Sequence, residues 1–267
     1  MDQGLRTDQG RTKHQALRTK NRSCKLPSVP TVTLPLLSVT AATPRSRLVT
    51  LDLRNQSFEF RPGQAVLIGA PGTERRPYSI SSSPEMAAET HSLDLLIALE
   101  ADGTLGPHLA AIAPGRVIAL EGPLGTFLFP EETPAQRLLF VAGGTGIAPL
   151  RAMIDHVLRR EAAYRLSLLY SARNGDEFAF IEELRAHESS GRLEVHQTVT
   201  RDDGTEWAGK RGRIGRAHFQ SVVHDPANTL CFVCGPRAMV NESVSTLAGL
   251  GVPADAIRTE AWSVPRA

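Results

Sequence analysis

Two stretches of the 267-residue sequence have residue types and spacing suited to binding phosphate groups. In the first, Arg76-Pro77-Tyr78-Ser79, the arginine and the tyrosine lie on one face if the stretch is a strand, because strand side chains alternate. Arginine binds phosphate through a charged, bidentate hydrogen bond. A tyrosine ring can stack on a planar heterocycle, and a serine hydroxyl can donate or accept. An ordinary edge strand with a serine-rich exit is the alternative explanation.

The second stretch is a glycine cluster, Gly143-Gly144-Thr145-Gly146, between an apolar run and a helical pattern. Glycines at such a turn let backbone N–H groups approach a pyrophosphate at the N-terminus of the helix. From Gly144 the sequence matches the first part of the dinucleotide fingerprint, with Pro149 at the place of its third glycine. Proline is tolerated in a first helical turn because its missing N–H has no intrahelical partner there.

The elements around the first stretch predict an antiparallel β-domain. Short strand-like runs separated by turn signals cover residues 32–39, 47–53, 65–68, 78–80, 93–99 and 117–120. One helix-like segment, 105–112, interrupts them. Several short strands at this spacing indicate an antiparallel sandwich or barrel.

The elements around the glycine cluster predict a different architecture. Strand-like runs at 138–142, 166–170, 193–199, 230–233 and 257–261 alternate with helical patterns at 150–159, 177–187, 216–223 and 238–250. Such alternation indicates a parallel sheet covered by helices on both faces. The predicted fold is therefore an antiparallel β-barrel domain over residues 28–132, followed by an α/β parallel-sheet domain over residues 133–267.

Composition narrows the function classes. The formal net charge is only +2, which argues against a nucleic-acid-binding protein. Residues 1–27 are predicted to be a disordered basic tail, since the first 25 residues contain seven Lys or Arg and two Asp. A dispensable extension, an upstream start and an organelle-targeting arm all fit that tail. Without an apolar run long enough to span a membrane, and with three cysteines, the predicted location is the cytoplasm.

Several motifs taken together resemble the ferredoxin–NADP⁺ reductase family. They are R-x-Y-S in the barrel, Gly122-Pro123-Leu124-Gly125-Thr126-Phe127, G-G-T-G-I-A-P and Cys234-Gly235-Pro236, in that order. The resemblance spans about residues 31–262. It implies a flavin-binding barrel and an NAD(P)-binding domain, with the flavin and nicotinamide rings meeting between them.

The resemblance assigns flavin contacts to the first stretch. Arg76 would hold the flavin phosphate, Tyr78 would pack on the isoalloxazine ring, and Ser79 would form a hydrogen bond near the flavin N5 edge, with Pro77 completing the motif. Trp262 corresponds to the aromatic residue that covers the flavin at the end of plant-type members, although five more residues follow it here.

The resemblance also assigns nicotinamide contacts. The residues that would cradle the dinucleotide are Gly144, Thr145, Gly146 and Pro149. Those beside the nicotinamide are Cys234, Gly235 and Pro236. Glu260 has the position of the family's C-terminal glutamate. Ser79, Cys234 and Glu260 are therefore the predicted catalytic residues, acting through orientation and charge placement rather than covalent chemistry.

One family position differs in this chain. Family members often have G-x-x-S at the start of the barrel's helix, whereas Gly106 stands in place of that serine. The segment of Gly106, His108 and Leu109 is still assigned to the flavin pyrophosphate, through backbone amides. The strand before it lacks the aromatic or arginine that often helps to hold an adenine. FAD is favoured as the cofactor, and FMN remains the alternative.

Metal and redox-thiol sites are not expected. Cys231 and Cys234 are three positions apart on a strand, so their side chains point to opposite faces and should not form a disulfide. The eight histidines show no metal-ligand spacing. A cluster suited to a two-iron, two-sulfur centre, which needs four thiolates or two thiolates with two histidines, is lacking as well.

The choice between nicotinamides depends on the end of the second strand of the α/β domain. Ser171 and Arg173 suit the 2′-phosphate of NADPH, reinforced by Arg201 and Arg211, whereas an acidic residue would suit NADH. The nearest acids, at 176–177, are expected to start the following helix. The balance favours NADPH.

The predicted function is a flavin-dependent NAD(P)H oxidoreductase that passes electrons to a separate acceptor. A ferredoxin or flavodoxin, an oxygenase component and a small molecule are the candidate acceptors. The alternative is a non-catalytic protein that retains the flavin fold as a redox sensor or interaction module, with the basic tail as its binding arm.

Overall fold

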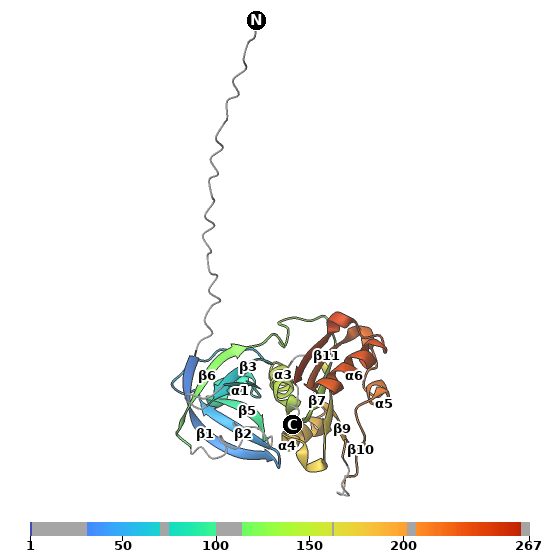
Figure 1. The fold of residues 1–267 in the computed structure, drawn as a ribbon. Helices are drawn as coiled ribbons and strands as arrows, with labels where there is room; N and C mark the ends of the chain where they lie inside the picture. The colour runs from blue at the N-terminus through green and yellow to red at the C-terminus, as the bar shows by residue number, and fades with distance from the viewer. Residues whose placement is uncertain (2–30, 70–74, 100–113, 162, 202–206, 263–267) are drawn as a thin grey trace.

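The computed structural model describes Met1 and residues 31–69, 75–99, 114–161, 163–201 and 207–262. Two sheets lie side by side, with helix α3 between them (Figure 1). The predicted tail, the helix expected at 105–112 and the assigned residues Gly106, His108 and Leu109 fall outside the described residues, as does the side chain of Trp262.

The first sheet is antiparallel and closes on itself. Its strands are β1 (Thr31–Thr43), β2 (Ser46–Asp52), β3 (Ala65–Gly69), β4 (Arg76–Ser79), β5 (Ser92–Ala98) and β6 (Val117–Leu124), in the order β4-β3-β6-β1-β2-β5. The two edge strands meet where Ile80 bridges Leu95 and the Ser81 N–H donates to the Asp94 carbonyl at 2.8 Å. Aliphatic side chains fill the interior. The predicted antiparallel barrel is therefore confirmed.

A short helix that we did not expect, α1 (Pro84–Thr90), follows β4. Its N-cap is Ser83, whose hydroxyl accepts a hydrogen bond from the Met86 N–H at 2.9 Å. Serine before proline is a recognised start signal, because proline fits the first helical turn. The signal was present in the sequence, but one or two helical turns leave almost no periodicity to detect.

The second sheet is parallel throughout. Its strands are β7 (Arg137–Gly143), β8 (Arg165–Ala172), β9 (Glu194–Val199), β10 (Lys210–Arg211), β11 (Thr229–Pro236) and β12 (Ile257–Trp262), in the order β10-β9-β8-β7-β11-β12. Helices α3 (Ile147–Arg159) and α4 (Ile181–Ser189) pack on one face, and α5 (Arg216–Gln220) and α6 (Arg237–Ala248) on the other. The predicted α/β domain is confirmed.

One predicted helix begins later than expected. The pattern at 177–187 predicted a single helix, but a 3-10 turn, η2 (Gly175–Glu177), comes first and α4 begins at Ile181. Phe180, directly before α4, has a left-handed backbone with φ of 61°. A bulky residue in this conformation breaks a right-handed helix, and sequence periodicity does not reveal it.

The two domains share one packed core. The Phe129 ring stacks on Phe232 of β11 at 5.6 Å between centroids, and Phe127 meets the same ring edge-on at 6.0 Å. A Cβ added to Gly63 would lie 2.1 Å from the Phe127 carbonyl oxygen and 2.4 Å from Met153 of α3. The barrel is therefore fixed closely against the parallel sheet, and this contact places the site.

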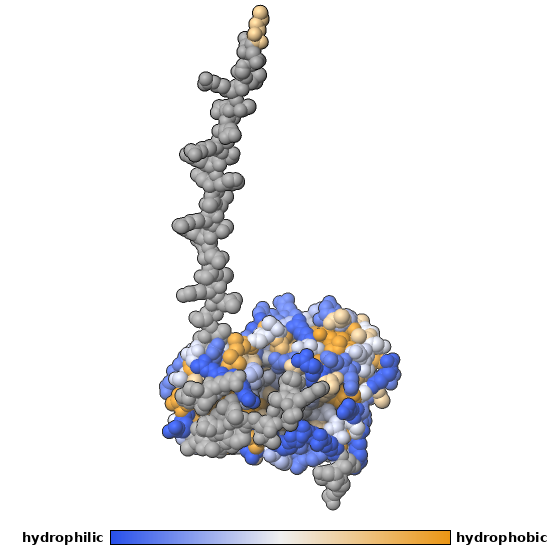
Figure 2. Space-filling view, in the orientation of Figure 1, coloured by the Kyte–Doolittle hydropathy of each residue, from blue (hydrophilic) through white to orange (hydrophobic). Residues whose placement is uncertain are grey.

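The outer surface is mixed in character. Figure 2 shows polar and apolar areas alternating over both domains on the face that it presents. Leu37 and Val117, on the neighbouring strands β1 and β6, are among the exposed large apolar residues that the structure describes. None of the helices in the described part of the chain has the length and hydropathy that a membrane crossing requires.

Candidate active site between the two domains

The three residues predicted to be catalytic meet at the junction of the domains. The Ser79 hydroxyl donates to Glu260 Oε2 at 3.3 Å, and the Cys234 thiol donates to the same oxygen at 3.8 Å. Ser79 ends β4 of the barrel, while Cys234 and Glu260 are opposite one another on the paired strands β11 and β12. The fold thus brings together side chains from both domains around one carboxylate oxygen.

Burial controls the protonation of this cluster. It raises the pKa of Glu260, and the hydrogen bonds from Ser79 and Cys234 oppose that shift only in part. Burial also raises the pKa of the Cys234 thiol well above its usual value, and the neighbouring carboxylate adds to the shift. The thiol therefore stays protonated near neutral pH, which suits a hydrogen-bond donor rather than a nucleophile.

The two cysteines of β11 lie on opposite faces of the sheet, as the strand alternation predicts. Cys231 packs in the core beneath α5 and α6, whereas Cys234 belongs to the core on the α3 side. Both are free thiols, and burial raises the pKa of Cys231 to about 12. Cys231 is a core residue, and no disulfide joins the pair.

The glycine turn after β7 is shaped by close contacts. Gly144 has φ of 56°, in the left-handed region that favours glycine, and space is open around its Cα. A Cβ on Gly146 would lie 2.3 Å from the Cys234 carbonyl oxygen, so no larger residue fits there without a backbone shift. The turn therefore packs directly on the strand that carries Cys234.

Tyr170 fixes this turn from the neighbouring strand β8. Its hydroxyl donates to the Gly144 carbonyl at 3.1 Å and accepts from the Ala179 N–H at 3.2 Å. The side chain is fully buried, and burial raises its pKa. The sequence suggested Tyr170 only as the end of a strand, because the partner of a tyrosine hydroxyl is decided by the tertiary fold.

A cavity of about 370 Å³ opens beside the turn and is lined by both domains. Among the assigned residues, those that line it are Gly144, Thr145, Ser171, Arg173 and Pro236. The other residues assigned to the dinucleotide do not line the cavity. Gly146 and Pro149 are buried beneath the turn, and Cys234 and Gly235 are buried next to it. The assigned residues thus divide into a cavity lining and its support.

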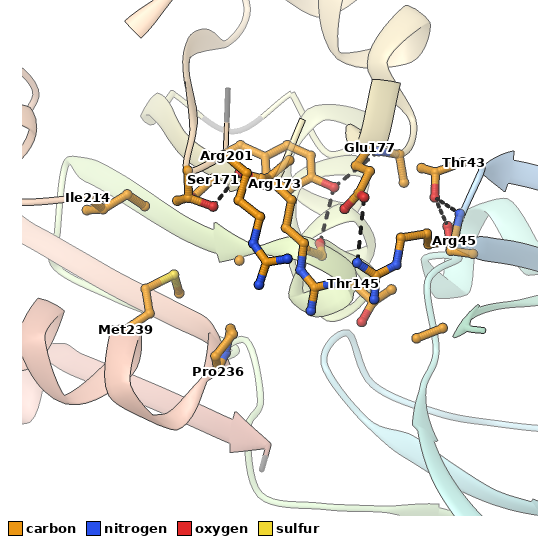
Figure 3. A pocket seen from close by; sticks show the side chains of 18 of the residues that line it. Thr43, Arg45, Thr145, Ser171, Arg173, Glu177, Arg201, Ile214, Pro236 and Met239 are labelled. Carbon is orange, nitrogen blue, oxygen red and sulfur yellow. Dashed lines mark hydrogen bonds and ion pairs between the residues drawn. The ribbon is translucent and has the colours of Figure 1, made fainter. Parts of the chain in front are cut away.

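The cavity carries an excess of positive charge. It is lined by Arg45, Arg173, Arg201 and Arg213, against Glu177 and Glu242. Figure 3 shows the guanidinium groups of Arg45, Arg173 and Arg201 pointing into the same space. Such a lining suits an anionic dinucleotide.

Two of these arginines were missed by sequence reasoning. Arg211, which was expected to reinforce the phosphate contact, does not line the cavity, and Arg213 does so instead. Arg45 comes from the barrel and lies 3.8 Å from Glu177 across the domain boundary. No sequence signal could have revealed a contact made by the hairpin of the other domain.

Glu177, shortly after β8, is one of the two acidic residues that line the cavity within the described part of the chain. Burial raises its pKa, Asp176 adds to that shift, and the charges of Arg45 and Arg201 oppose it. Its carboxylate lies within the cavity lining rather than in the first turn of α4, where the sequence had placed it. Glu177 therefore belongs to the 3-10 turn η2, which precedes α4, and not to α4 itself.

The residues assigned to the flavin lie on the outer part of the barrel next to this cluster. Arg76 and Tyr78 are half-buried, and Tyr78 packs against the barrel core. Within the described residues, the Arg76 side chain has no hydrogen bond or ion pair. A half-buried guanidinium without a carboxylate partner is a suitable donor for a phosphate, so these residues fit a flavin nucleotide.

Two protein-family models match this chain, one in each of its two domains. An oxidoreductase FAD-binding domain model matches residues 34–129, and an oxidoreductase NAD-binding domain model matches residues 140–245. Together they cover well over half of the chain. The chain belongs to the ferredoxin–NADP⁺ reductase-like family.

Individual relatives agree with this assignment. A ferredoxin–NADP reductase B of Sorangium cellulosum is 33% identical over 230 residues, covering 79% of this chain and 91% of that protein. An NADPH oxidoreductase of Mycobacterium tuberculosis is 28% identical over 217 residues, covering 79% of this chain and 54% of that protein.

Solved structures show the same fold. The ferredoxin reductase of carbazole 1,9a-dioxygenase superposes with a TM-score of 0.76 at 26% identity, covering 87% of this chain and 69% of that one. A ferredoxin–NADP⁺ reductase of Neisseria gonorrhoeae superposes with a TM-score of 0.73 at 22% identity, covering 86% of this chain and 98% of that one.

These findings establish the general activity of this family member. It is an NAD(P)H-dependent flavin oxidoreductase with an FAD-binding barrel and an NAD-binding α/β domain. The alternative of a non-catalytic sensor or interaction module finds no support in the matches.

Proposed function

We propose that this reductase takes hydride from NADPH and delivers single electrons to a separate acceptor. The observation that carries the proposal is the Ser79–Glu260–Cys234 cluster, which joins the barrel to the glycine turn of the α/β domain. FAD, when bound, supplies the conversion of a two-electron hydride into one-electron steps. The protein supplies binding, orientation and electrostatics around it.

The barrel residues would hold the flavin. Arg76 would bind its phosphate through charge-assisted hydrogen bonds, since its guanidinium is half-buried and has no carboxylate partner within the described residues. Tyr78 would pack on the ring system, and the Ser79 hydroxyl would hydrogen-bond at its reactive edge. Ser79 is suited to this role because Glu260 orients its hydroxyl.

The α/β domain would hold the nicotinamide dinucleotide in the arginine-lined cavity. The turn at Gly144 and Thr145 lies at the base of that cavity, and Pro236 lies at its wall. Buried Cys234 and Glu260 would place a donor and a partly desolvated carboxyl beside the nicotinamide. Their contribution is orientation rather than covalent bonding.

NADPH is the proposed donor because the cavity gathers cations at the end of β8. Ser171 and Arg173 line that end, and Arg201 and Arg213 approach from the following loops. Together they suit a dianionic 2′-phosphate. Glu177 would favour a free ribose hydroxyl, but it lies near Arg45 and Arg201, which offset its charge.

A separate acceptor is proposed because this sequence shows neither the four cysteines nor the pairs of cysteines and histidines at ligand spacing that an iron–sulfur cluster requires. Relatives with ferredoxin reductase in their names support a ferredoxin or an oxygenase component as the acceptor. A small acceptor such as a quinone or a ferric chelate is the second possibility.

An anaerobic titration tests this function. The FAD-loaded protein is mixed with NADPH or NADH, flavin absorbance is followed, and oxidised ferredoxin, quinone or ferric chelate is then added. We expect faster bleaching with NADPH, followed by reoxidation by at least one acceptor. Protein that binds FAD but is not bleached by either nicotinamide would contradict the proposal, and preferential bleaching by NADH would overturn the NADPH assignment.

A further inference from the structure

A buried arginine of the α/β domain reaches into the barrel. Arg151 of α3 is only 7% exposed. Its Nη1 donates to the carbonyl of Ser81 at 3.1 Å and lies 3.4 Å from Asp94 Oδ2, both in the barrel domain. One guanidinium therefore contacts the segment after β4 and the strand β5 at once.

The other side of the same guanidinium is held by α4. Its Nε donates to both carboxylate oxygens of Glu183 at 3.0 and 2.9 Å, and Nη2 lies 2.8 Å from Oε2. The ring of Phe180 lies 4.3 Å from the guanidinium carbon, close enough for a cation–π contact. Phe180 has a left-handed backbone, as described for the start of α4, and tertiary contacts must maintain this conformation.

The guanidinium is charged in this buried position. Burial alone lowers the pKa of Arg151, but the hydrogen bonds and charges of Glu183 and Asp94 raise it overall. A charged, buried group with fixed partners on three elements has little freedom to move. Arg151 therefore acts as a rigid link between α3, α4 and the barrel.

The barrel end of this link is next to the active site. Ser81 is two residues after Ser79, and its N–H donates to the Asp94 carbonyl at the point where the barrel closes. Asp94 also accepts from the Thr50 hydroxyl at 2.9 Å, which anchors it within the barrel. The position of Ser79 relative to the α/β domain thus depends on where Arg151 holds Ser81.

We propose that Arg151 is a positioning residue for hydride transfer, holding the β4 end so that Ser79 meets Glu260. The inference rests on the proposed function, because it assigns Arg151 to the geometry of the same site. Loss of the link would let the barrel end of β4 shift relative to β12. A shift of about 1 Å in a reacting pair can cost up to about a hundredfold in rate.

A second arginine, directly after α3, provides a matched control. The Arg160 Nε lies 3.4 Å from Glu85 of α1, across the same boundary, and the Arg160 side chain is 62% exposed. His156 also contacts Glu85, at 2.8 Å, so Glu85 keeps a partner when Arg160 is replaced. If every inter-domain ion pair had the same effect, the loss of Arg160 would slow hydride transfer as much as the loss of Arg151.

The test compares FAD-loaded wild type, Arg151→Met, Arg151→Lys and Arg160→Met. Single-turnover bleaching of the flavin by NADPH gives the hydride-transfer rate and the nucleotide Kd separately. For Arg151→Met we expect a rate about tenfold to a hundredfold lower and a Kd within about twofold of wild type. Arg151→Lys should recover part of the rate, because lysine keeps the charge but not the fork. Arg160→Met should match wild type.

The outcomes separate this inference from the proposed function. Wild type that NADPH does not bleach would contradict the function itself. Wild type that bleaches, alongside folded Arg151→Met that bleaches within about twofold of its rate, would overturn the positioning role while leaving the function intact. An equal loss in Arg160→Met would overturn it too.

A milder variant covers the case in which Arg151→Met does not fold. Glu183→Gln keeps the guanidinium but removes the charge that holds it from α4, and Glu183 is partly exposed. We expect a hydride-transfer rate about threefold lower, with a changed flavin absorbance band and an unchanged Kd. A wild-type rate and spectrum in this variant would overturn the proposal.

Discussion

The Ser79 hydroxyl donates a 3.3 Å hydrogen bond to Glu260, a residue 181 positions later in the chain. Ser79 ends a barrel strand and Glu260 lies in the last strand of the parallel sheet, so the bond forms only when the two domains are docked. The Cys234 thiol donates to the same carboxylate oxygen. The geometry of this proposed catalytic cluster is therefore a property of the interface rather than of either domain.

Glu260 should show a pH-dependent effect on stability. Its pKa is raised by burial, so the folded state favours the neutral acid, and stability is lost as the pH rises through the folded pKa. The thermal stability of Glu260→Gln should therefore improve relative to wild type as the pH rises above the ordinary glutamate pKa of about 4.3.

Glu194 gives the control of opposite sign for this effect. Burial alone raises the pKa of Glu194, but hydrogen bonds from His196 and Ser167 lower it overall. The stability that Glu194 contributes is present above its unfolded pKa and is lost as the pH falls through its lowered folded pKa. Glu194→Gln should therefore worsen relative to wild type as the pH rises toward about 4.3, and the difference should stay constant above it, where that of Glu260→Gln changes. A Glu260→Gln difference that stays flat or reverses would show that burial does not govern this carboxyl.

Cys234→Ser should slow hydride transfer by roughly tenfold while flavin remains bound, because the shorter side chain changes the placement of the donor beside Glu260. Stopped-flow bleaching and flavin content measure the two effects. Cys231→Ser is the control, since Cys231 lies on the other face of the sheet and should affect stability only. A covalent adduct on Cys234 detected by mass spectrometry during turnover would contradict the orientation role.

Arg76→Ala should weaken flavin binding by about 1.5–3 kcal/mol, the range for a hydrogen bond to a charged group. Fluorescence titration of the flavin-free protein with FAD gives the Kd. The matched control is Arg116→Ala, an exposed arginine of the same domain, which should bind FAD like wild type. An unchanged Kd in Arg76→Ala would remove the phosphate role from this residue.

Arg173→Ala should raise the KM for NADPH by about tenfold or more, and that for NADH by about twofold at most, because only NADPH carries the 2′-phosphate. Steady-state kinetics with both nicotinamides measure this. Arg211→Ala, a nearby arginine outside the cavity lining, should leave both constants near wild type. Equal losses for the two nicotinamides would mean that Arg173 serves the shared part of the dinucleotide.

Gly146→Ala should lower the free energy of unfolding by about 1–3 kcal/mol and impair turnover, because the added Cβ would lie 2.3 Å from the Cys234 carbonyl oxygen. Urea unfolding and hydride-transfer kinetics report the two effects. Gly191→Ala is the control. Gly191 has φ of 70° and open space around it, so this substitution should lower the free energy of unfolding by about 1–2 kcal/mol without affecting turnover. Wild-type stability and turnover in Gly146→Ala would contradict the close-packing argument.

The sequence by itself determined the local chemistry of this reductase. Apolar alternation and turn residues indicated the barrel strands, and the alternation of strands with helices indicated the parallel sheet. The motif residues around Arg76, Gly144 and Cys234 could be found because each is a short pattern with local backbone requirements. Opposite faces for Cys231 and Cys234 followed from strand alternation alone.

The tertiary structure alone decided which residues meet across the domain boundary. Arg45 reaches the arginine-lined cavity from a barrel hairpin, Arg213 takes the place expected for Arg211, and Arg151 reaches Ser81 from α3. None of these contacts has a sequence signal, because they depend on how two separately folded surfaces pack. The periodicity of apolar residues in the sequence indicates which face of a strand or helix is buried. The partner of a long polar side chain, in contrast, depends on how the two domains pack against each other.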